Sequence, residues 1–189
     1  MVDAETVVSL IKAAPSKQCL LDPLPTCLLK NCASLLAPYI IVIINSSLTV
    51  GSFPTSWKHA ILSPLLKKAG LDVSLPTNYR PISNLYFLSK LLERVIYKQT
   101  TDYLIEHKLF PEFQSAYRRV HSTETAVLKV FSDIIDAIEK GQLALLSLLD
   151  LSAAFDTVDH FIMRERLERS YGVGGSSLRW FESYLTGRS

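Results

Sequence analysis

The run from Leu143 to Leu149 is almost wholly apolar, and it ends abruptly at Asp150. A short apolar run between polar residues is typical of a strand buried on both faces, although periodicity alone leaves a buried helix open. Gly141 before the run and the polar residues after it favour the strand. A carboxylate at the carboxyl end of such a strand is well placed to hold a metal ion or a phosphate-bearing ligand. The alternative for Asp150 is a plain turn-capping residue.

Length and composition are those of an ordinary globular domain. The 189 residues suit one domain that can bury a sizeable core. A hydrophobic content of 48% with 20% charged residues argues against disorder. The odd number of cysteines (Cys19, Cys27 and Cys32) and the absence of paired zinc-ligand spacing indicate neither a disulfide scaffold nor a zinc site, so a reducing compartment is expected.

The net charge of +2 conceals an uneven distribution along the chain. Residues 1–57 are balanced, residues 58–129 carry eleven basic and six acidic side chains, and residues 130–189 carry six basic and nine acidic ones. A basic middle suits contact with polyanions, and an acidic end suits cations. Solvated charged faces without a function are the alternative.

The first part of the chain, to about residue 56, predicts helices separated by proline-containing turns. The apolar run Leu35–Ile44 predicts a buried helix, with Ser34 as its cap and an end near Gly51. The run is shorter than the roughly 20 residues that span a bilayer, so no membrane segment is expected. It also lacks the position and basic flank of a signal peptide.

A hairpin with cations near its tip is predicted next. Ala60–Leu66 predicts one strand, Lys67 and Lys68 begin a polar turn around Gly70, and residues 78–81 return the chain in extended form. Four helices are expected after the hairpin: one to about Glu106, one between Ser122 and Gly141, one capped by Asp159, and a short one with Trp180, Phe181 and Tyr184.

Four segments resemble, in the same order, motifs of reverse transcriptases from non-LTR (LINE-type, jockey-like) retrotransposons. They are Asn78-Tyr-Arg-Pro-Ile-Ser-Asn84, Gln114-Ser-Ala-Tyr-Arg-Arg-Val-His-Ser-Thr-Glu-Thr-Ala126, Leu148-Leu-Asp-Leu-Ser-Ala-Ala-Phe-Asp-Thr-Val-Asp-His160 and Trp180-Phe-Glu-Ser-Tyr-Leu-Thr-Gly-Arg188. Four matches in one order are far more specific than one. The resemblance covers roughly residues 57–189 and, more loosely, the part before them.

The resemblance implies an α+β, helix-rich fold that forms the fingers and an incomplete palm of a right-hand polymerase. On this reading residues 1–56 are a helical segment that packs on the fingers, residues 57–141 are the fingers, and residues 142–189 begin the palm. Family members continue to a Gly-Val-Pro-Gln-Gly-Ser motif and a Phe/Tyr-Ala-Asp-Asp motif, whereas this sequence stops at Ser189. The chain is therefore expected to be a fragment without the second and third catalytic carboxylates.

The resemblance also implies the chemistry of the palm segment. Asp150 matches the first metal-binding aspartate, and the carbonyl of Leu151 would be its neighbouring ligand. The complete enzyme uses two Mg²⁺ ions, which one carboxylate and one carbonyl cannot organise, so the ions are not expected to be fully bound here. Phe155 would pack against the sugar of the incoming nucleotide and select deoxynucleotides, with a core phenylalanine as the alternative. Asp156 and Asp159 are interpreted as turn and cap residues.

The upstream motifs imply contacts with nucleotide and template. Arg80 matches the arginine that grips the triphosphate, because a guanidinium pairs bidentately with phosphate oxygens. Lys67 or Lys68 would add a point charge to the same group. Gln114, Arg118 and Arg119 would contact the template or nucleotide backbone without reading its sequence. The neighbouring aromatic residues Phe113 and Tyr117 could stack on a base, but core packing is their more common role.

The partners implied are an RNA template, a DNA primer and deoxynucleoside triphosphates, in an intracellular location that is nuclear or cytoplasmic. The oligomeric state stays open. One alternative is a non-catalytic, nucleic-acid-binding remnant of a transposable element, which would share the fold. A second is a helical protein-interaction scaffold, which requires the four motif matches to be coincidence.

Overall fold

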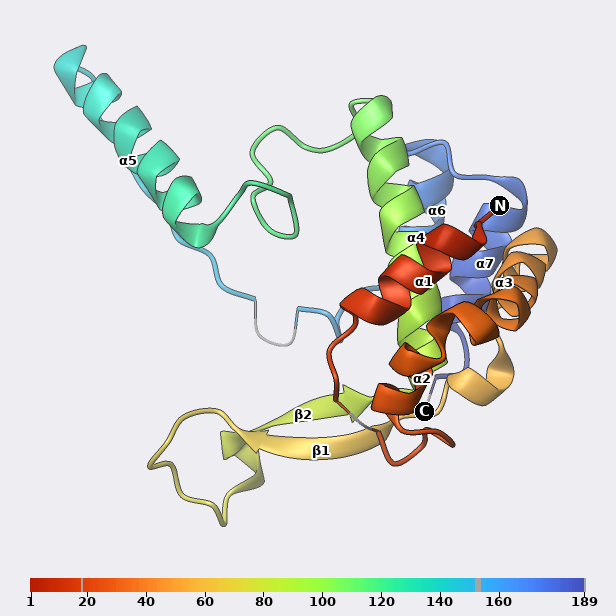
Figure 1. Cartoon of the computed structure of the whole chain (residues 1–189). Coiled ribbons are helices and arrows are strands. Elements are labelled where there is room, and N and C mark those ends of the chain that lie inside the picture. The colour runs from red at the N-terminus through yellow and green to blue at the C-terminus, as the bar shows by residue number, and fades with distance from the viewer. Residues whose placement is uncertain (18, 152–153, 189) are drawn as a thin grey trace. The chain divides into compact units, whose positions relative to one another are not determined.

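The computed structural model describes residues 1–17, 19–151 and 154–188. Most of the elements in this part of the chain are helices (Figure 1). The elements are α1 (Ala4–Ala13), α2 (Thr26–Asn31), α3 (Ala33–Val50), η1 (Thr55–Trp57), β1 (Ile61–Leu66), η2 (Pro76–Asn78), β2 (Tyr79–Asn84), α4 (Phe87–Glu106), α5 (Thr123–Glu139), α6 (His160–Arg169) and α7 (Gly175–Leu185). A helix-rich α+β class is therefore confirmed. The chain divides into one compact unit of Met1–Tyr103 with Asp159–Ser189 and another of Leu104–Val158.

The core of the first unit joins helices that are far apart in the sequence. α1 contributes Val7 and Ile11, and α4 contributes Leu91, Leu92 and Val95, all buried at helical spacing. Buried residues of α3 and α7 complete the core, namely Ala33, Ala37, Ile40, Ile44 and Trp180. In α1 the two buried residues thus lie four positions apart, on one face of the helix.

Helix α3 begins earlier and runs longer than expected. Cys32 precedes the first residue of α3, and the backbone N–H of Cys32 donates to the carbonyl of Leu28 in α2. No side chain caps α3. The prediction of Ser34 as cap is therefore wrong, because α2 leads directly into α3 and Ser34 lies inside the first turn. With 18 residues and a mean hydropathy of 1.8, α3 is long and apolar enough to cross a membrane by length and composition alone. Its buried residues nevertheless belong to the core.

Gly51 ends α3 as expected and also allows a close approach to α7. Its φ of 72° is left-handed, and a Cβ added there would lie 2.5 Å from the backbone oxygen of Ser176. Any other residue would therefore meet both backbone strain and a backbone clash. Figure 1 shows α7 beside α3.

An aromatic cluster fastens α7 to the rest of the first unit. The ring of Trp180 stacks on Tyr184 with centroids 5.2 Å apart and meets Phe53 edge-on at 5.6 Å. Its indole N–H donates to the hydroxyl of Ser47 at 3.0 Å, and that hydroxyl donates to the carbonyl of Ser52 at 2.6 Å. The buried polar groups of this cluster thus have partners, as burial requires.

Tyr184 continues this cluster toward α4 and the end of the chain. Its hydroxyl donates to the Oε1 atom of Glu93 at 3.0 Å, and this Glu93 oxygen also accepts a hydrogen bond from the guanidinium of Arg188 at 3.1 Å. The guanidinium of Arg188 also lies 4.1 Å from the centroid of the Tyr184 ring. Burial raises the pKa of Tyr184, and the negative charge of Glu93 raises that pKa further. The phenol is therefore a neutral hydrogen-bond donor near pH 7.

The predicted hairpin is confirmed. β1 pairs antiparallel with β2, with Leu65 opposite Arg80 and Leu66 opposite Tyr79 (Figure 1). In the loop between the strands, Asp72 accepts hydrogen bonds from the backbone N–H and the hydroxyl of Ser74. These bonds hold the pKa of Asp72 below its usual value, so the loop contains a fixed anion as well as cations.

In the second unit, α5 has the predicted ends. The hydroxyl of Ser122 accepts the N–H of Thr125, the Thr125 hydroxyl accepts the N–H of Ser122, and Gly141 follows the helix at a φ of 69°. Its apolar side chains are exposed within the described chain; they include Val127, Leu128, Phe131, Ile135 and Ile138.

The predicted buried strand Leu143–Leu149 is wrong. These residues form no strand, and Leu145 and Leu149 are 97% and 91% exposed. A strand forms only when a neighbour supplies hydrogen-bond partners, and the sheet among the described residues consists of β1 and β2 alone. An apolar run without such a neighbour stays open to solvent and is a template for association.

Candidate functional site

Three cationic side chains come from the end of the hairpin where the loop joins β1 to β2. Lys67 and Lys68 follow β1 directly and are exposed, and Arg80 lies near the start of β2, also exposed. The backbone N–H of Lys67 bonds the carbonyl of Asn78 at 2.9 Å, so pairing continues one step beyond the strand. Opposite and diagonal positions of an antiparallel pair are neighbours, so Lys67 and Arg80 come together at this end.

The charged side chains of the hairpin differ in the number of hydrogen bonds that they already make with the protein. The ammonium of Lys67 donates to the carbonyl of Thr77 at 2.8 Å, which uses one of its three donors. The guanidinium of Arg80 forms no hydrogen bond or ion pair with another residue that the structure describes. Arg80 can therefore present its whole fork of donors to an anion without first breaking a bond.

Gln114, Arg118 and Arg119 share one loop of the second unit, between α4 and α5. The guanidinium of Arg118 donates to the carbonyl of Glu112 at 3.3 Å and lies 5.8 Å from the centroid of the Phe110 ring. The side-chain amide of Gln114 donates to the carbonyl of Ala116 at 3.3 Å. Arg119 is exposed, and its backbone carbonyl pairs with the ring nitrogen of His121. Arg118 thus shapes the loop, whereas the side chain of Arg119 extends toward solvent.

The same loop carries unusual backbone conformations and exposed aromatic rings. Tyr117 and Val120 have φ values of 58° and 64°, in the left-handed region that such residues seldom adopt. Phe113 and Tyr117 are exposed, so their expected role as core residues is wrong. Exposed aromatic rings of this kind can stack on planar ligands, and Phe113 is 78% exposed.

Asp150, Leu151 and Phe155 also lie in the second unit, on exposed chain after α5. Phe155 is 78% exposed, so the alternative of a core phenylalanine is wrong. Asp156 lies in a turn, and Asp159 caps α6 through the N–H groups of Phe161 and Ile162, both as predicted. The motif residues Ser152 and Ala153 lie outside the described residues.

The described side chains form no ready-made metal cage. Within residues 1–17, 19–151 and 154–188, no group of three or more His, Cys, Asp or Glu side chains could hold a metal ion. Asp150 is exposed, and its carboxylate forms no hydrogen bond with another described residue. Asp150 and Leu151 thus offer one carboxylate and one carbonyl.

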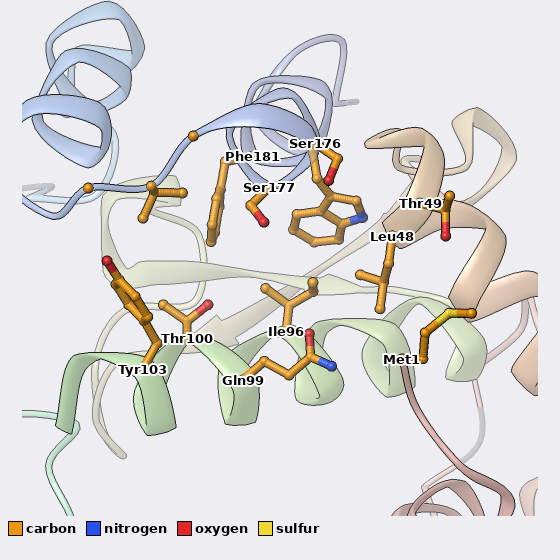
Figure 2. Close-up of a pocket in the computed structure, with 14 residues that line it drawn as sticks. Met1, Leu48, Thr49, Ile96, Gln99, Thr100, Tyr103, Ser176, Ser177 and Phe181 are labelled. Carbon is orange, nitrogen blue, oxygen red and sulfur yellow. The ribbon is translucent and has the colours of Figure 1, made fainter. Parts of the chain in front are cut away.

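One cavity of the first unit is lined by none of the predicted site residues. It has a volume of about 690 Å³ and lies between α4, α7 and the end of α3. Figure 2 shows Ile96 and Tyr103 of α4 facing Phe181 of α7 across it. The side chains of the described residues that line it are apolar, or neutral and polar, and none of these side chains is charged. No lysine or arginine side chain there could therefore bind a triphosphate.

A smaller cavity, lined by charged side chains that include an aspartate, was not predicted from the sequence. Lys17, Asp22, Lys90 and Arg94 line this space of about 250 Å³. The spacing of Lys90 and Arg94, one helical turn apart, was a signal within the sequence. The approach of Lys17 and Asp22 was not, because it depends on how the segment between α1 and α2 meets α4.

The comparisons with known proteins agree with these motifs. Residues 66–186 match the reverse transcriptase (RNA-dependent DNA polymerase) family. This region includes Lys67, Arg80, the loop of Arg118 and Arg119, and Asp150 with Phe155.

Individual relatives come from mobile elements of fruit flies. The chain is 32% identical over 160 residues to the probable RNA-directed DNA polymerase from transposon BS of Drosophila melanogaster, covering 84% of the chain and 18% of that protein. It is 33% identical over 163 residues to the RNA-directed DNA polymerase from mobile element jockey of the same species, covering 84% of the chain and 17% of that protein. The jockey polymerase of Drosophila funebris is 36% identical over 124 residues, which are 65% of the chain and 13% of that protein.

The chain thus spans less than a fifth of the length of each of these relatives. The family match nevertheless covers well over half of the chain and includes the segments that carry the motifs. The chain belongs to the reverse transcriptase family and is homologous to the RNA-directed DNA polymerases of non-LTR retrotransposons.

Proposed function

We propose that this chain supplies the fingers and the first metal-binding part of the palm of an RNA-directed DNA polymerase. The observation that carries the proposal is the family match over residues 66–186, which includes the cationic hairpin, the arginine loop and Asp150. In this proposal an RNA template and a DNA primer lie along the basic segment, and a deoxynucleoside triphosphate is the substrate. Residues 1–56 pack on the fingers, residues 57–141 form them, and residues 142–189 begin the palm.

The hairpin is the proposed grip on the triphosphate. Arg80 is exposed and its guanidinium has no hydrogen-bond or ion-pair partner among the described residues, so it can take two phosphate oxygens at once. Lys67 keeps two donors beyond its bond to Thr77, and Lys68 adds a second ammonium. Pairing continues to Lys67 and Asn78, so Lys67 lies diagonal to Arg80 across the two strands, and Lys68 follows Lys67 in sequence.

Asp150 and Leu151 are the groups that would hold Mg²⁺. An exposed carboxylate with an adjacent backbone carbonyl offers the hard oxygen ligands that Mg²⁺ prefers. Bound Mg²⁺ in such enzymes activates the attacking hydroxyl and stabilises the leaving oxygen. Because two ions need more than one carboxylate, we propose that residues 1–189 alone do not extend a primer. A chain that binds nucleic acid without catalysis is then the second candidate function.

Nucleic-acid binding by the whole chain should weaken steeply with salt, because cation–phosphate contacts release counterions. Arg119→Ala is expected to lower the slope of log affinity against log salt by about 0.7 to 0.9, the contribution of one contact. Fluorescence anisotropy of a labelled primer–template at several salt concentrations measures this slope. Arg119 is preferred to Arg118, whose guanidinium also bonds carbonyls of its own loop.

Arg166→Ala is the matched control for Arg119→Ala. Arg166 is exposed on α6, outside the basic segment, so its loss should leave the slope unchanged. An affinity that does not respond to salt, or equal effects of the two substitutions, would contradict this electrostatic account.

Phe155 is the proposed filter against ribonucleotides, as an aromatic ring five positions after Asp150. Phe155→Val should open space for a 2′-hydroxyl and raise the ratio of ribo- to deoxynucleotide incorporation, on the order of ten- to a hundredfold. The measurement needs a jockey polymerase in which residues of this chain replace the matching segment. Phe161→Val, at a second exposed phenylalanine, is the control. An unchanged ratio would remove Phe155 from the role of filter.

A further inference from the structure

A cavity of about 250 Å³ in the first unit lies outside the four motif segments. Lys17 and Asp22 reach it from the segment between α1 and α2, and Lys90 and Arg94 reach it from α4. Phe87 and Leu91, both buried, contribute apolar surface. The space therefore combines a small apolar floor with three cations and one carboxylate.

The carboxylate in this cavity, that of Asp22, already accepts hydrogen bonds from two backbone N–H groups. One oxygen of Asp22 accepts the N–H of Phe87, at the start of α4, at 2.7 Å. The other oxygen accepts the N–H of Cys19 at 3.4 Å. Asp22 thus fixes the segment before α2 to the first turn of α4, and it makes no ion pair with a described cation of the cavity within 4.0 Å.

Within the part of the chain that the structure describes, the three cations have no ion-pair partner, unlike other charges on α4. Lys98 is 2.7 Å from Asp102, and Glu93 is 3.1 Å from Arg188. No ion pair to a described residue involves Lys17, Lys90 or Arg94. Like charges one turn apart on a helix repel each other, so Lys90 and Arg94 form an arrangement that an anion would stabilise.

The size of the space limits which anion can enter. Pockets for drug-sized ligands usually measure roughly 300 to 1,000 Å³, so this space is smaller than the usual pocket for such a ligand. One phosphate group is small enough, and its oxygens can meet donors that arrive from two elements. The planar fork of Arg94 suits two such oxygens, and Lys17 and Lys90 add point charges.

We propose that this cavity binds one backbone phosphate of a nucleic-acid strand through Lys17, Lys90 and Arg94. The choice of a nucleic acid rests on the proposed polymerase function. The site would anchor a strand on residues 1–56 and α4, separately from the hairpin and from the arginine loop. It would position that strand without reading its sequence, as phosphate contacts do.

The test measures binding of a labelled single-stranded RNA to the full 189-residue chain by fluorescence anisotropy. Lys17→Gln and Lys90→Gln should each weaken affinity about two- to fivefold at low salt, which is the size of one exposed charge contact. Because both residues would hold one phosphate, the double variant should lose less than the product of the two effects. The salt slope of the double variant should fall by about 0.7.

Matched controls separate a site from diffuse charge. Lys98→Gln removes an exposed lysine from the same helix, and Lys12→Gln removes one from the end of α1. Neither residue lines the cavity. Equal losses in all four single variants would overturn the proposal, because they would show a general effect of net charge.

Titration with inorganic phosphate, followed by amide NMR, distinguishes a strand from a free anion. Shifts near Lys17 and Lys90 that disappear in Lys90→Gln are expected. If phosphate binds there but RNA affinity is unchanged in the variants, the cavity takes a free anion and the assignment to a strand is wrong. If Arg119→Ala weakens RNA binding while Lys17→Gln and Lys90→Gln do not, this site fails and the proposed function stands. If the unsubstituted chain binds no RNA, both fail.

Discussion

Trp180→Ala should lower the free energy of unfolding by about 3 to 5 kcal/mol, the usual cost of replacing a buried tryptophan with alanine. Trp180 is 2% exposed and contacts the rings of Phe53, Phe181 and Tyr184. Its removal leaves a cavity between α7 and α3 and deprives Ser47 of a donor. Natural domains are stable by only about 5 to 15 kcal/mol, so much of the first unit's stability would be lost.

Urea denaturation followed by far-ultraviolet circular dichroism measures this effect. Trp180→Phe keeps a ring in place and removes the N–H, so it should cost much less, about 1 kcal/mol for the hydrogen bond plus a smaller packing loss. Phe161→Ala removes an aromatic ring that is 72% exposed and should cost less than about 0.5 kcal/mol. Equal midpoints for Trp180→Ala and Phe161→Ala would show that the aromatic cluster does not hold α7.

Elements with local signals are predictable from this sequence. Ser122 and Asp159 cap helices through groups two or three residues away, and Gly51 and Gly141 take left-handed conformations at helix ends. The β1–β2 hairpin follows from a strand pattern, a polar turn and a pre-proline arginine. In each case the residues that decide the structure are close in sequence, so chain propensity and capping are sufficient.

Elements that need distant partners are not predictable in the same way. Leu143–Leu149 has the composition of a buried strand, but a strand depends on neighbours that composition cannot identify. Ser34 has the chemistry of a cap, yet α2 runs into α3 and places Ser34 inside the helix. The bond between Asp22 and Phe87 and the bond between Trp180 and Ser47 join residues far apart in the chain.

The same division applies to the candidate site. The grouping of Lys67 with Arg80 follows from the hairpin, and Gln114, Arg118 and Arg119 are neighbours in sequence. Which of these side chains is free does not follow from the sequence. Arg118 bonds carbonyls of its own loop, whereas Arg119 is exposed. The charged cavity of Lys17, Lys90 and Arg94 likewise depends on tertiary packing.

Asp150 is the proposed metal-binding carboxylate of an RNA-directed DNA polymerase. In a jockey polymerase that carries residues 66–186 of this chain, Asp150→Asn should lower RNA-templated primer extension at least about a thousandfold. The reason is that a metal ion contributes several kcal/mol to the transition state, and each 1.36 kcal/mol is a factor of ten. Asp156→Asn, in the nearby turn, is the matched control and should retain activity.

The direct measurement is primer extension on an RNA template with Mg²⁺, by the chimera, its two variants and the 189-residue chain alone. We expect extension by the unsubstituted chimera and by Asp156→Asn, extension at least about a thousandfold lower by Asp150→Asn, and none by the chain alone. Extension by Asp150→Asn at the rate of the unsubstituted chimera would contradict the assignment of Asp150. Extension by the chain alone would contradict the proposal that one carboxylate is too few.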